Sequence, residues 1–258
     1  MGVTTYPEKV GRVFLDAAIE VGGAARLTVD ILRRLVPPVF DAGELKRCLF
    51  RMGYKSLSIM IATSLVVGII LVIQAFVFVD RYGLRSQLGS GAGFNTIREL
   101  GPIILALMFS GRVGAFTAAE LGTMTVTDQV DGLRCLAIDP ISYLVVPRFL
   151  AMIVSLVALT IVGNTMALVS ASIMGDVMMD VDLYTFWSNL FVQLTPWDYA
   201  LGVIKSALFG AIVAVTSCYH GLATTGGAPG VGLSVNKAVV SSAVAIFVVD
   251  FFSTFVLG

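Results

Sequence analysis

The feature that most constrains the fold is a run without any charged residue, SLSIMIATSLVVGIILVIQAFVFV, at residues 56–79. A helix needs about 20 apolar residues to cross the roughly 30 Å hydrocarbon core of a bilayer, and this run is long enough. The whole chain points the same way, because 57% of its residues are hydrophobic and 13% are charged. Soluble domains usually carry about 25% charged residues, and one soluble core could not bury so much apolar surface. We therefore expect the chain to fold in a membrane.

Four more apolar segments predict membrane-spanning helices, at about 100–122, 146–175, 197–220 and 238–257. Between them we expect a polar, glycine-rich loop at 80–98, an acidic loop at 176–196 and a glycine-rich loop at 221–237. A short helix is expected near 127–136, with a stop at Pro140. The expected fold class is an all-α membrane protein with five spans and a cytoplasmic helix between the second and third.

The N-terminal region differs from these spans. Apolar residues recur at helical spacing over residues 8–36, with most charges on the other side, which predicts an amphipathic helix in the membrane interface that ends at Pro37 and Pro38. A soluble partner-binding helix is the alternative. A second short helix is expected to begin at Asp41, with Glu44 completing a capping pair. We therefore divide the chain into an interfacial region, 1–55, and a five-span domain, 56–258.

Basic residues indicate the orientation. Nine of the 17 Lys and Arg residues precede residue 56, so the positive-inside rule predicts a cytoplasmic N-terminus. The loops around 123–147 and 221–237 would then be cytoplasmic, and 80–98 and 176–196 would face outward, although Arg81, Arg85 and Arg98 oppose this. The first 30 residues carry charge throughout and lack the apolar core of a signal peptide. These features suit a bacterial inner-membrane protein.

Charged residues interrupt the apolar spans. Arg112 and Glu120 lie in the second span, Lys205 in the fourth and Asp250 in the fifth. A charge at the bilayer centre costs at least about 2.5–3.5 kcal/mol, so we expect these side chains to face protein or an aqueous cavity. They could form a polar interior used for transport, or ion pairs that only lock helices together. A proton relay is less favoured, because the single histidine, His220, lies at an expected membrane boundary.

Several kinds of chemistry leave no signature. The sequence has no phosphate-binding loop, no zinc pattern and no serine-nucleophile motif, so we expect neither an enzyme nor a metal site. The net charge is zero and no basic run occurs, which argues against a nucleic-acid partner. The cysteines Cys48, Cys135 and Cys218 stand singly and are interpreted as packing residues.

One long block is more specific. Residues 98–148 read RELGPIILALMFSGRVGAFTAAELGTMTVTDQVDGLRCLAIDPISYLVVPR, and shorter blocks follow: IKSALFGAIVAVTSCYHGL (204–222), GGAPGVG (226–232) and VVDFFSTF (248–255). Together they resemble the MlaE/YrbE family, the permease subunits of ABC transporters that work with MCE proteins. Two positions depart from the family pattern, which commonly has a glutamate where Pro229 stands and a glutamine where His220 stands.

The resemblance implies a set of partners. These would be a second copy of the chain in a homodimer, a cytoplasmic ABC ATPase that binds ATP and magnesium, and a periplasmic MCE hexamer. It also allows for a small accessory cytoplasmic protein. The cargo would be lipid, typically phospholipid, with sterol or fatty acid in some relatives. No cofactor is expected in this chain.

The resemblance also suggests roles for particular residues. Arg98 and Glu99 would meet a lipid headgroup at the outer mouth. Acyl chains would contact Leu71, Phe78, Leu100 and Ile104, and the ATPase would contact Thr127, Asp128, Asp131 and Arg134. Arg112, Glu120, Lys205 and Asp250 would hold moving helices in two alternative pairings.

Two other functions are consistent with the composition. A stand-alone, proton-coupled secondary transporter of a hydrophobic substrate would gain support from an internal repeat, and the sequence shows none. A membrane-embedded, lipid-modifying enzyme would need a nucleophile or metal cluster near the interface.

Overall fold

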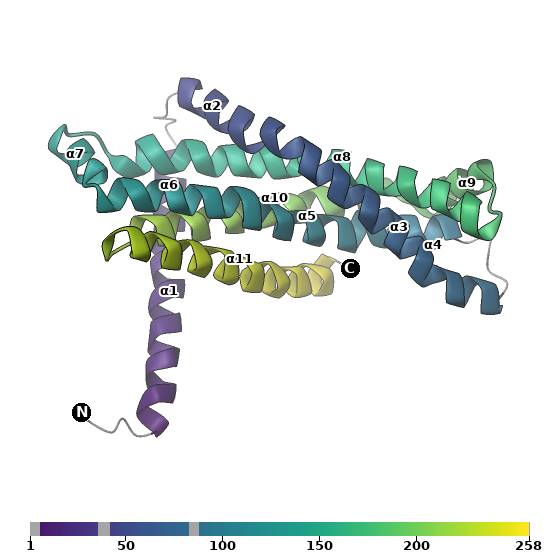
Figure 1. Cartoon of the computed structure of the whole chain (residues 1–258), viewed down its shortest axis with the longest axis horizontal. Coiled ribbons are helices and arrows are strands. Elements are labelled where there is room, and N and C mark those ends of the chain that lie inside the picture. Colours follow the sequence, from purple (N-terminus) through teal and green to yellow (C-terminus); the bar gives the residue numbers. More distant parts are fainter. Residues whose placement is uncertain (1–5, 36–41, 83–87, 258) are drawn as a thin grey trace.

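The protein is helical over almost all of the residues that its computed structural model describes, 6–35, 42–82 and 88–257 (Figure 1). No strand occurs among these residues. Five helical segments are long and apolar enough to cross a membrane: Gly43–Phe76, Leu88–Val126, Ile141–Met179, Pro196–Leu222 and Gly227–Val256. The expected all-α, five-span fold is therefore confirmed.

The helices follow one another with short connections. In chain order they are α1 (Tyr6–Leu35), α2 (Ala42–Met52), α3 (Leu57–Tyr82), α4 (Leu88–Asn95), α5 (Gly101–Phe109), α6 (Ala115–Val126), α7 (Gln129–Cys135), α8 (Val146–Met179), α9 (Leu183–Gln193), α10 (Pro196–Leu222) and α11 (Gly227–Leu257). A 3₁₀ turn (Tyr54–Ser56) joins α2 to α3, and π-helical turns at Thr96–Leu100, Ser110–Gly114 and Ile141–Val145 precede α5, α6 and α8. The second span is thus one continuous helical path with two widened turns.

Three expected loops contain helix instead. α4 occupies much of the segment 80–98, α9 lies within 176–196, and α11 begins at Gly227 rather than near residue 238. α9 forms because Phe186 and Leu190, four residues apart, bury their side chains together with α4 and α8. Pro229 does not prevent α11 from starting early, because proline is tolerated in the first turn of a helix, where its missing N–H has no partner to lose.

The N-terminal helix α1 crosses the other helices and extends away from them (Figure 1). Its Leu27 and Ile31 are buried, whereas Leu15 and Ile19 are 63% and 65% exposed. It ends before Pro37 and Pro38, which lie outside the described residues, as does Asp41 of the expected capping pair. Its location in a membrane interface stays a prediction.

An ion pair fixes the end of α1. Arg34 donates a hydrogen bond from Nε to the carboxylate of Asp139 in the connection between α7 and α8. Burial alone would raise the pKa of Asp139, but hydrogen bonds from Ser142 and Arg34 outweigh it and lower the pKa below its ordinary value. The ionised carboxylate is therefore the form that the fold favours.

α10 lies at the centre of the bundle, where it packs against α5, α6, α8 and α11. The main core includes Phe109, Met152, Leu156 and Phe209. Burial is uneven among the spans, since 61% of the most apolar stretch of the third span is buried but only 17% of that of the fifth. α11 therefore presents many apolar side chains, such as Phe251 and Phe255, to lipid or to a partner.

Candidate functional site

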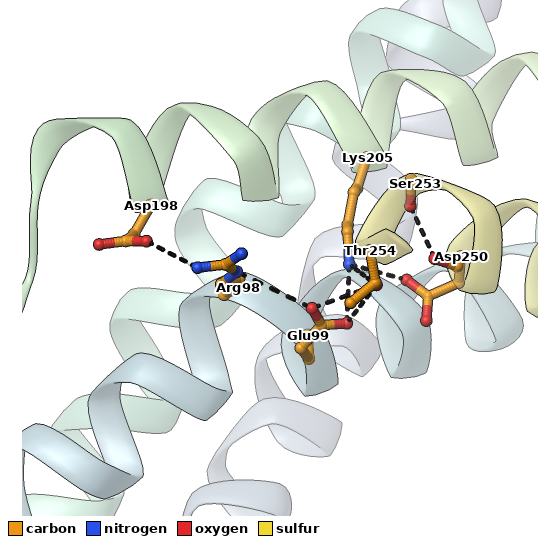
Figure 2. A network of polar contacts seen from close by, with 7 residues as sticks. All are labelled: Arg98, Glu99, Asp198, Lys205, Asp250, Ser253 and Thr254. Atoms are coloured by element: carbon orange, nitrogen blue, oxygen red, sulfur yellow. Dashed lines mark hydrogen bonds and ion pairs between the residues drawn. The ribbon is translucent and has the colours of Figure 1, made fainter. Parts of the chain in front are cut away.

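A buried lysine is the centre of the candidate site. Lys205 on α10 is only 1% exposed. Its Nζ donates to Glu99 Oε2 at 2.7 Å, to Asp250 Oδ1 at 3.0 Å and to Thr254 Oγ1 at 2.8 Å. An ammonium group has three N–H donors, and each finds an acceptor here. Figure 2 shows these acceptors converging on Lys205 from two other helical segments.

The local structure explains why these residues meet. Glu99 lies in the π-helical turn Thr96–Leu100, between α4 and α5, while Asp250 and Thr254 are four residues apart on one face of α11. π-Helical turns are rare and occur frequently at functional sites. α10 carries Lys205 between these two segments, so the cluster joins the second, fourth and fifth spans.

A second ion pair extends the cluster. Arg98 Nη1 lies 3.2 Å from Asp198 Oδ1 on α10, and Arg98 Nε lies 4.0 Å from Glu99 Oε1 (Figure 2). Asp198 also completes a capping box with Thr195, which starts α10 and fixes the carboxylate in place. We name the five charged residues Arg98, Glu99, Asp198, Lys205 and Asp250 the outer cluster. The sequence analysis missed Asp198, although the capping pattern Thr195–Pro196–Trp197–Asp198 could have indicated it.

The outer cluster can offer polar contacts to a ligand. Its two cations and three carboxylates leave one net negative charge when all are ionised. The side chains of Glu99 and Asp250 remain 25% and 15% exposed, whereas that of Lys205 is 2% exposed. A ligand that reaches this site would therefore meet carboxylate oxygens held in position by a buried cation.

The structure divides the four charges that the sequence analysis grouped. Lys205 and Asp250 pair with each other, but Glu120 lies in a separate cluster with Arg51 and Arg148. Both terminal nitrogens of Arg51 donate to the Glu120 carboxylate at 2.9 Å, and Arg148 Nη2 lies 3.2 Å from it. Glu120 is 21 residues beyond Glu99, about 30 Å along a helical path, so these charges cannot share one cluster.

Arg112 contacts a backbone group rather than an acidic side chain. It is exposed, and its Nη2 donates to the backbone carbonyl oxygen of Lys55 at 2.6 Å. Among the residues that the structure describes, Arg112 does not pair with Asp250, and Glu120 does not pair with Lys205. The roles of all four residues in transport stay predictions.

The residues expected to contact an ATPase lie together on α7 and its start. Thr127, Asp128, Asp131 and Arg134 are all exposed, and Arg134 Nη1 lies 2.7 Å from Asp131 Oδ1. Val130 is buried and anchors the short helix to the main core. α7 thus presents a polar surface at one end of the molecule, far from α4 and α9 (Figure 1).

The residues expected to contact acyl chains are less well defined. Leu71 on α3, Leu100 and Ile104 are half-buried, and Ile104 lines a small cavity between α3, α5 and α8. Phe78 lies within α3, but its side chain is outside the described part of the structure.

His220, the residue expected at a membrane boundary, lies two residues before the end of α10, and its position relative to a membrane stays a prediction. It is 6% exposed, and its Nε2 lies 2.9 Å from Ser241 Oγ on α11.

Comparison with known proteins places this geometry in context. A family model described as Permease MlaE matches residues 45–256. A probable ABC transporter permease protein of Rickettsia bellii is 32% identical over 246 residues, which cover 95% of both chains.

Two further relatives carry more specific names. The Intermembrane phospholipid transport system permease protein MlaE of Haemophilus influenzae is 29% identical over 208 residues, 80% of this chain and 79% of that protein. The chloroplastic protein TRIGALACTOSYLDIACYLGLYCEROL 1 of Arabidopsis thaliana is 41% identical over 201 residues, 78% of this chain. The matched part spans 57% of that plant protein.

Proposed function

Because this chain belongs to the Permease MlaE family, we propose that it is the membrane-spanning subunit of an ABC transporter for lipid. The transporter moves phospholipid between the inner membrane and a periplasmic MCE protein. A separate cytoplasmic ATPase binds ATP and magnesium and supplies the energy. This chain is not the catalytic subunit.

The outer cluster is the observation that carries the proposal. A buried lysine with three acceptors joins three membrane-spanning segments, and Glu99 and Asp250 remain partly exposed beside it. Placing a charged side chain inside a membrane-spanning helix costs free energy, and such residues commonly mark a substrate pathway. A phospholipid has a polar headgroup and apolar chains, so it suits a site where fixed charges adjoin apolar helices.

The proposal includes the oligomeric state, the orientation in the membrane and the partner proteins. Two copies of the chain form a homodimer with an apolar cavity that opens outward and accepts lipid tails. The N-terminus is cytoplasmic, residues 1–55 form the interfacial region, and residues 56–258 form the permease domain. An MCE hexamer binds at the periplasmic side, and a small accessory cytoplasmic protein is a further candidate partner.

α7 is the proposed coupling helix. Its exposed charges Asp131 and Arg134 are supported by buried Val130, and it connects the second span to the third. Closure of the ATPase dimer would displace α7 and so move the two spans that flank it. This movement would narrow the cavity and transfer lipid to or from the MCE protein.

A reconstituted assay tests the proposal. The complex is purified in mild detergent, examined for a bound ATPase, an MCE protein and phospholipid, and placed in vesicles with fluorescent phospholipid. We expect ATP-dependent lipid transfer that falls at least about tenfold in Lys205→Ala, which leaves two carboxylates without the cation between them. Asp250→Ala should also lower transfer, but by less, because Lys205 keeps Glu99 as a partner. Asp131→Ala/Arg134→Ala should instead weaken ATPase binding and leave the bound phospholipid in place.

Asp176→Ala is the control for the α7 variant, because it removes an exposed charge from the last turn of α8, at the end of that helix remote from α7. Transfer by the isolated chain, driven by a proton gradient without an ATPase, would contradict the proposal and favour a secondary transporter. Full transfer by both Lys205→Ala and Asp250→Ala would show that the outer cluster only packs helices.

A further inference from the structure

A second charged pocket lies far from the outer cluster. It has a volume of about 370 Å³ and is lined by Arg51, Met52, Lys55, Ser56, Arg112, Val113 and Phe116. We name it the cationic pocket. The end of α2 and the following 3₁₀ turn form one side, and the π-helical turn Ser110–Gly114 with α6 forms the other. Arg112 follows Glu99 by 13 residues, about 20 Å along a helical path, so the two sites are separate.

The charges of the cationic pocket are not balanced. Arg112 donates to the carbonyl oxygen of Lys55, which places a guanidinium beside a lysine. Among the described residues, no acidic side chain pairs with either Lys55 or Arg112. Glu120 adjoins the pocket through Arg51, but its two oxygens already accept from Arg51 and lie beside Arg148. The pocket therefore presents a net positive charge.

Two buried polar groups at the pocket have unused hydrogen-bonding capacity. Ser56 is 1% exposed and its Oγ has no partner, and Nε of Arg51 is buried without one. Leaving a buried donor unpaired costs about 1–3 kcal/mol, so an acceptor atom bound here would recover part of that cost. A ligand with several oxygen acceptors fits both the charge and these donors.

Apolar side chains form the rest of the wall. Met52 and Val113 are buried, and the Phe116 ring, 48% exposed, lies 5.0 Å from the Arg51 guanidinium carbon. The pocket lies within helical segments that are long and apolar enough to span a membrane, Gly43–Phe76 and Leu88–Val126. Its ligand would therefore carry a phosphate-like anion together with an apolar portion.

We propose that the cationic pocket binds the phosphate of an anionic glycerophospholipid, with the adjoining acyl chain against Phe116. The cations favour a lipid such as phosphatidylglycerol over a zwitterionic one, because no acidic residue is among the described residues that line the pocket. Arginine and lysine both form charge-assisted hydrogen bonds to phosphate. This site does not depend on the transport proposed above, and it differs from the outer cluster in charge and position.

Photo-crosslinking to the purified full-length chain tests the site. The probe is phosphatidylglycerol with a diazirine on one acyl chain, in micelles of an uncharged detergent, and mass spectrometry identifies the labelled peptides. We expect saturable labelling of peptides that contain residues 52–56 or 113–116. Lys55→Gln/Arg112→Gln should raise the half-saturating lipid concentration about tenfold or more, because two charge-assisted contacts are lost. Lys55→Gln alone should give a smaller increase.

Lys46→Gln/Arg47→Gln is the matched control, since it removes two exposed cations from α2 outside the pocket. It should change half-saturation less than twofold, and all variants should keep the thermal unfolding midpoint of the wild type. Unlabelled phosphatidylglycerol should compete better than phosphatidylethanolamine, and diacylglycerol should compete poorly. Equal competition by diacylglycerol, or equal loss in the control variant, would overturn the site. Displacement by inorganic phosphate at the same concentration as the lipid would assign it to a free anion and overturn the lipid assignment.

Discussion

At the scale of single residues, Lys205 shows what a buried charge requires. Its ammonium donates to Glu99, Asp250 and Thr254, so the cost of removing it from water is offset by two carboxylates and a hydroxyl. The arrangement is also asymmetric, because both acids contact this one lysine, and Glu99 has only a more distant second cation, Arg98 Nε at 4.0 Å. Replacing Lys205 is therefore expected to lower the free energy of unfolding more than replacing either acid.

Lys205→Met tests this asymmetry. The variant leaves Glu99 and Asp250 close together without their cation, and we expect it to lower the free energy of unfolding by about 3 kcal/mol, as when one partner of a buried pair is removed. The midpoint of denaturant unfolding in micelles measures the effect. The control Glu99→Gln/Lys205→Met/Asp250→Asn removes all three charges and should regain most of the loss. An unchanged midpoint in Lys205→Met would contradict the importance of these contacts.

The sequence could indicate some members of these clusters but not their partners. Lys205 and Asp250 are evident because they interrupt apolar runs. Arg51 and Arg148 are not, since they lie at the edges of apolar runs, where charge is common. Arg51 is 69 residues from Glu120, and no local pattern reports a contact over that distance. Pairing depends on how helices pack, which the sequence does not display.

At the scale of elements, the C-terminal end of α7 has the hydrogen bonds of a common helix-capping motif. The N–H of Ile138 donates to the Leu133 carbonyl and that of Ala137 donates to the Arg134 carbonyl, both at 3.0 Å. This pattern is a Schellman motif, in which the residue after the C-cap adopts a left-handed conformation and is usually glycine. Here that residue is Ala137, with a φ of 58°.

Ala137→Gly should stabilise the end of α7. A left-handed conformation costs a residue with a Cβ about 1–2 kcal/mol, and glycine avoids most of this cost, so we expect a gain of up to about 1 kcal/mol. Slower hydrogen exchange of the backbone amides at positions 137 and 138 in the variant would measure this gain. Cys135→Gly is the matched control, because that exposed position is helical, and it should speed exchange instead. Faster exchange in Ala137→Gly would contradict the explanation.

Among the elements, the long helices and the short helices α2 and α7 were predictable, whereas α4 and α9 were not. Residues 56–79 and 149–175 are charge-free over more than the thickness of a bilayer, so composition alone indicates them. α4 has the sequence LGSGAGFN, in which three glycines disfavour helix, and it forms because Leu88, Ser90 and Gly93 are buried by tertiary packing. Burial by distant elements thus overrides the local preference.

At the scale of the whole molecule, the polar clusters lie toward opposite ends of the bundle. The outer cluster follows α4 and α9 in the chain, and the cluster of Arg51, Glu120 and Arg148 lies near α7. Apolar residues such as Phe109, Met152 and Phe209 fill the core between the spans. Each cluster therefore has its own partners and shares none with the other.

Independent clusters should contribute additively to stability. Glu120→Gln removes the negative charge that pairs with Arg51 and Arg148 and should be destabilising, as Lys205→Met is. We expect the double variant to lose the sum of the two free energies of unfolding, within about 0.5 kcal/mol, since distant sites without shared partners are additive. Denaturant unfolding of the wild type, both single variants and the double variant measures the difference. A discrepancy above about 1 kcal/mol would indicate that the clusters are coupled through the helices.

The position of Glu120 has a mechanical consequence. Glu120 lies six residues before the end of α6, and Arg148 lies at the start of α8. Their ion pair therefore joins the two helices that flank α7 in the chain. We therefore expect a force applied to α7 to move α6 and α8 together rather than to separate them. α7 would then move as a rigid unit with the ends of α6 and α8. The two hydrogen bonds from Arg51 to Glu120 attach α2 to the same unit.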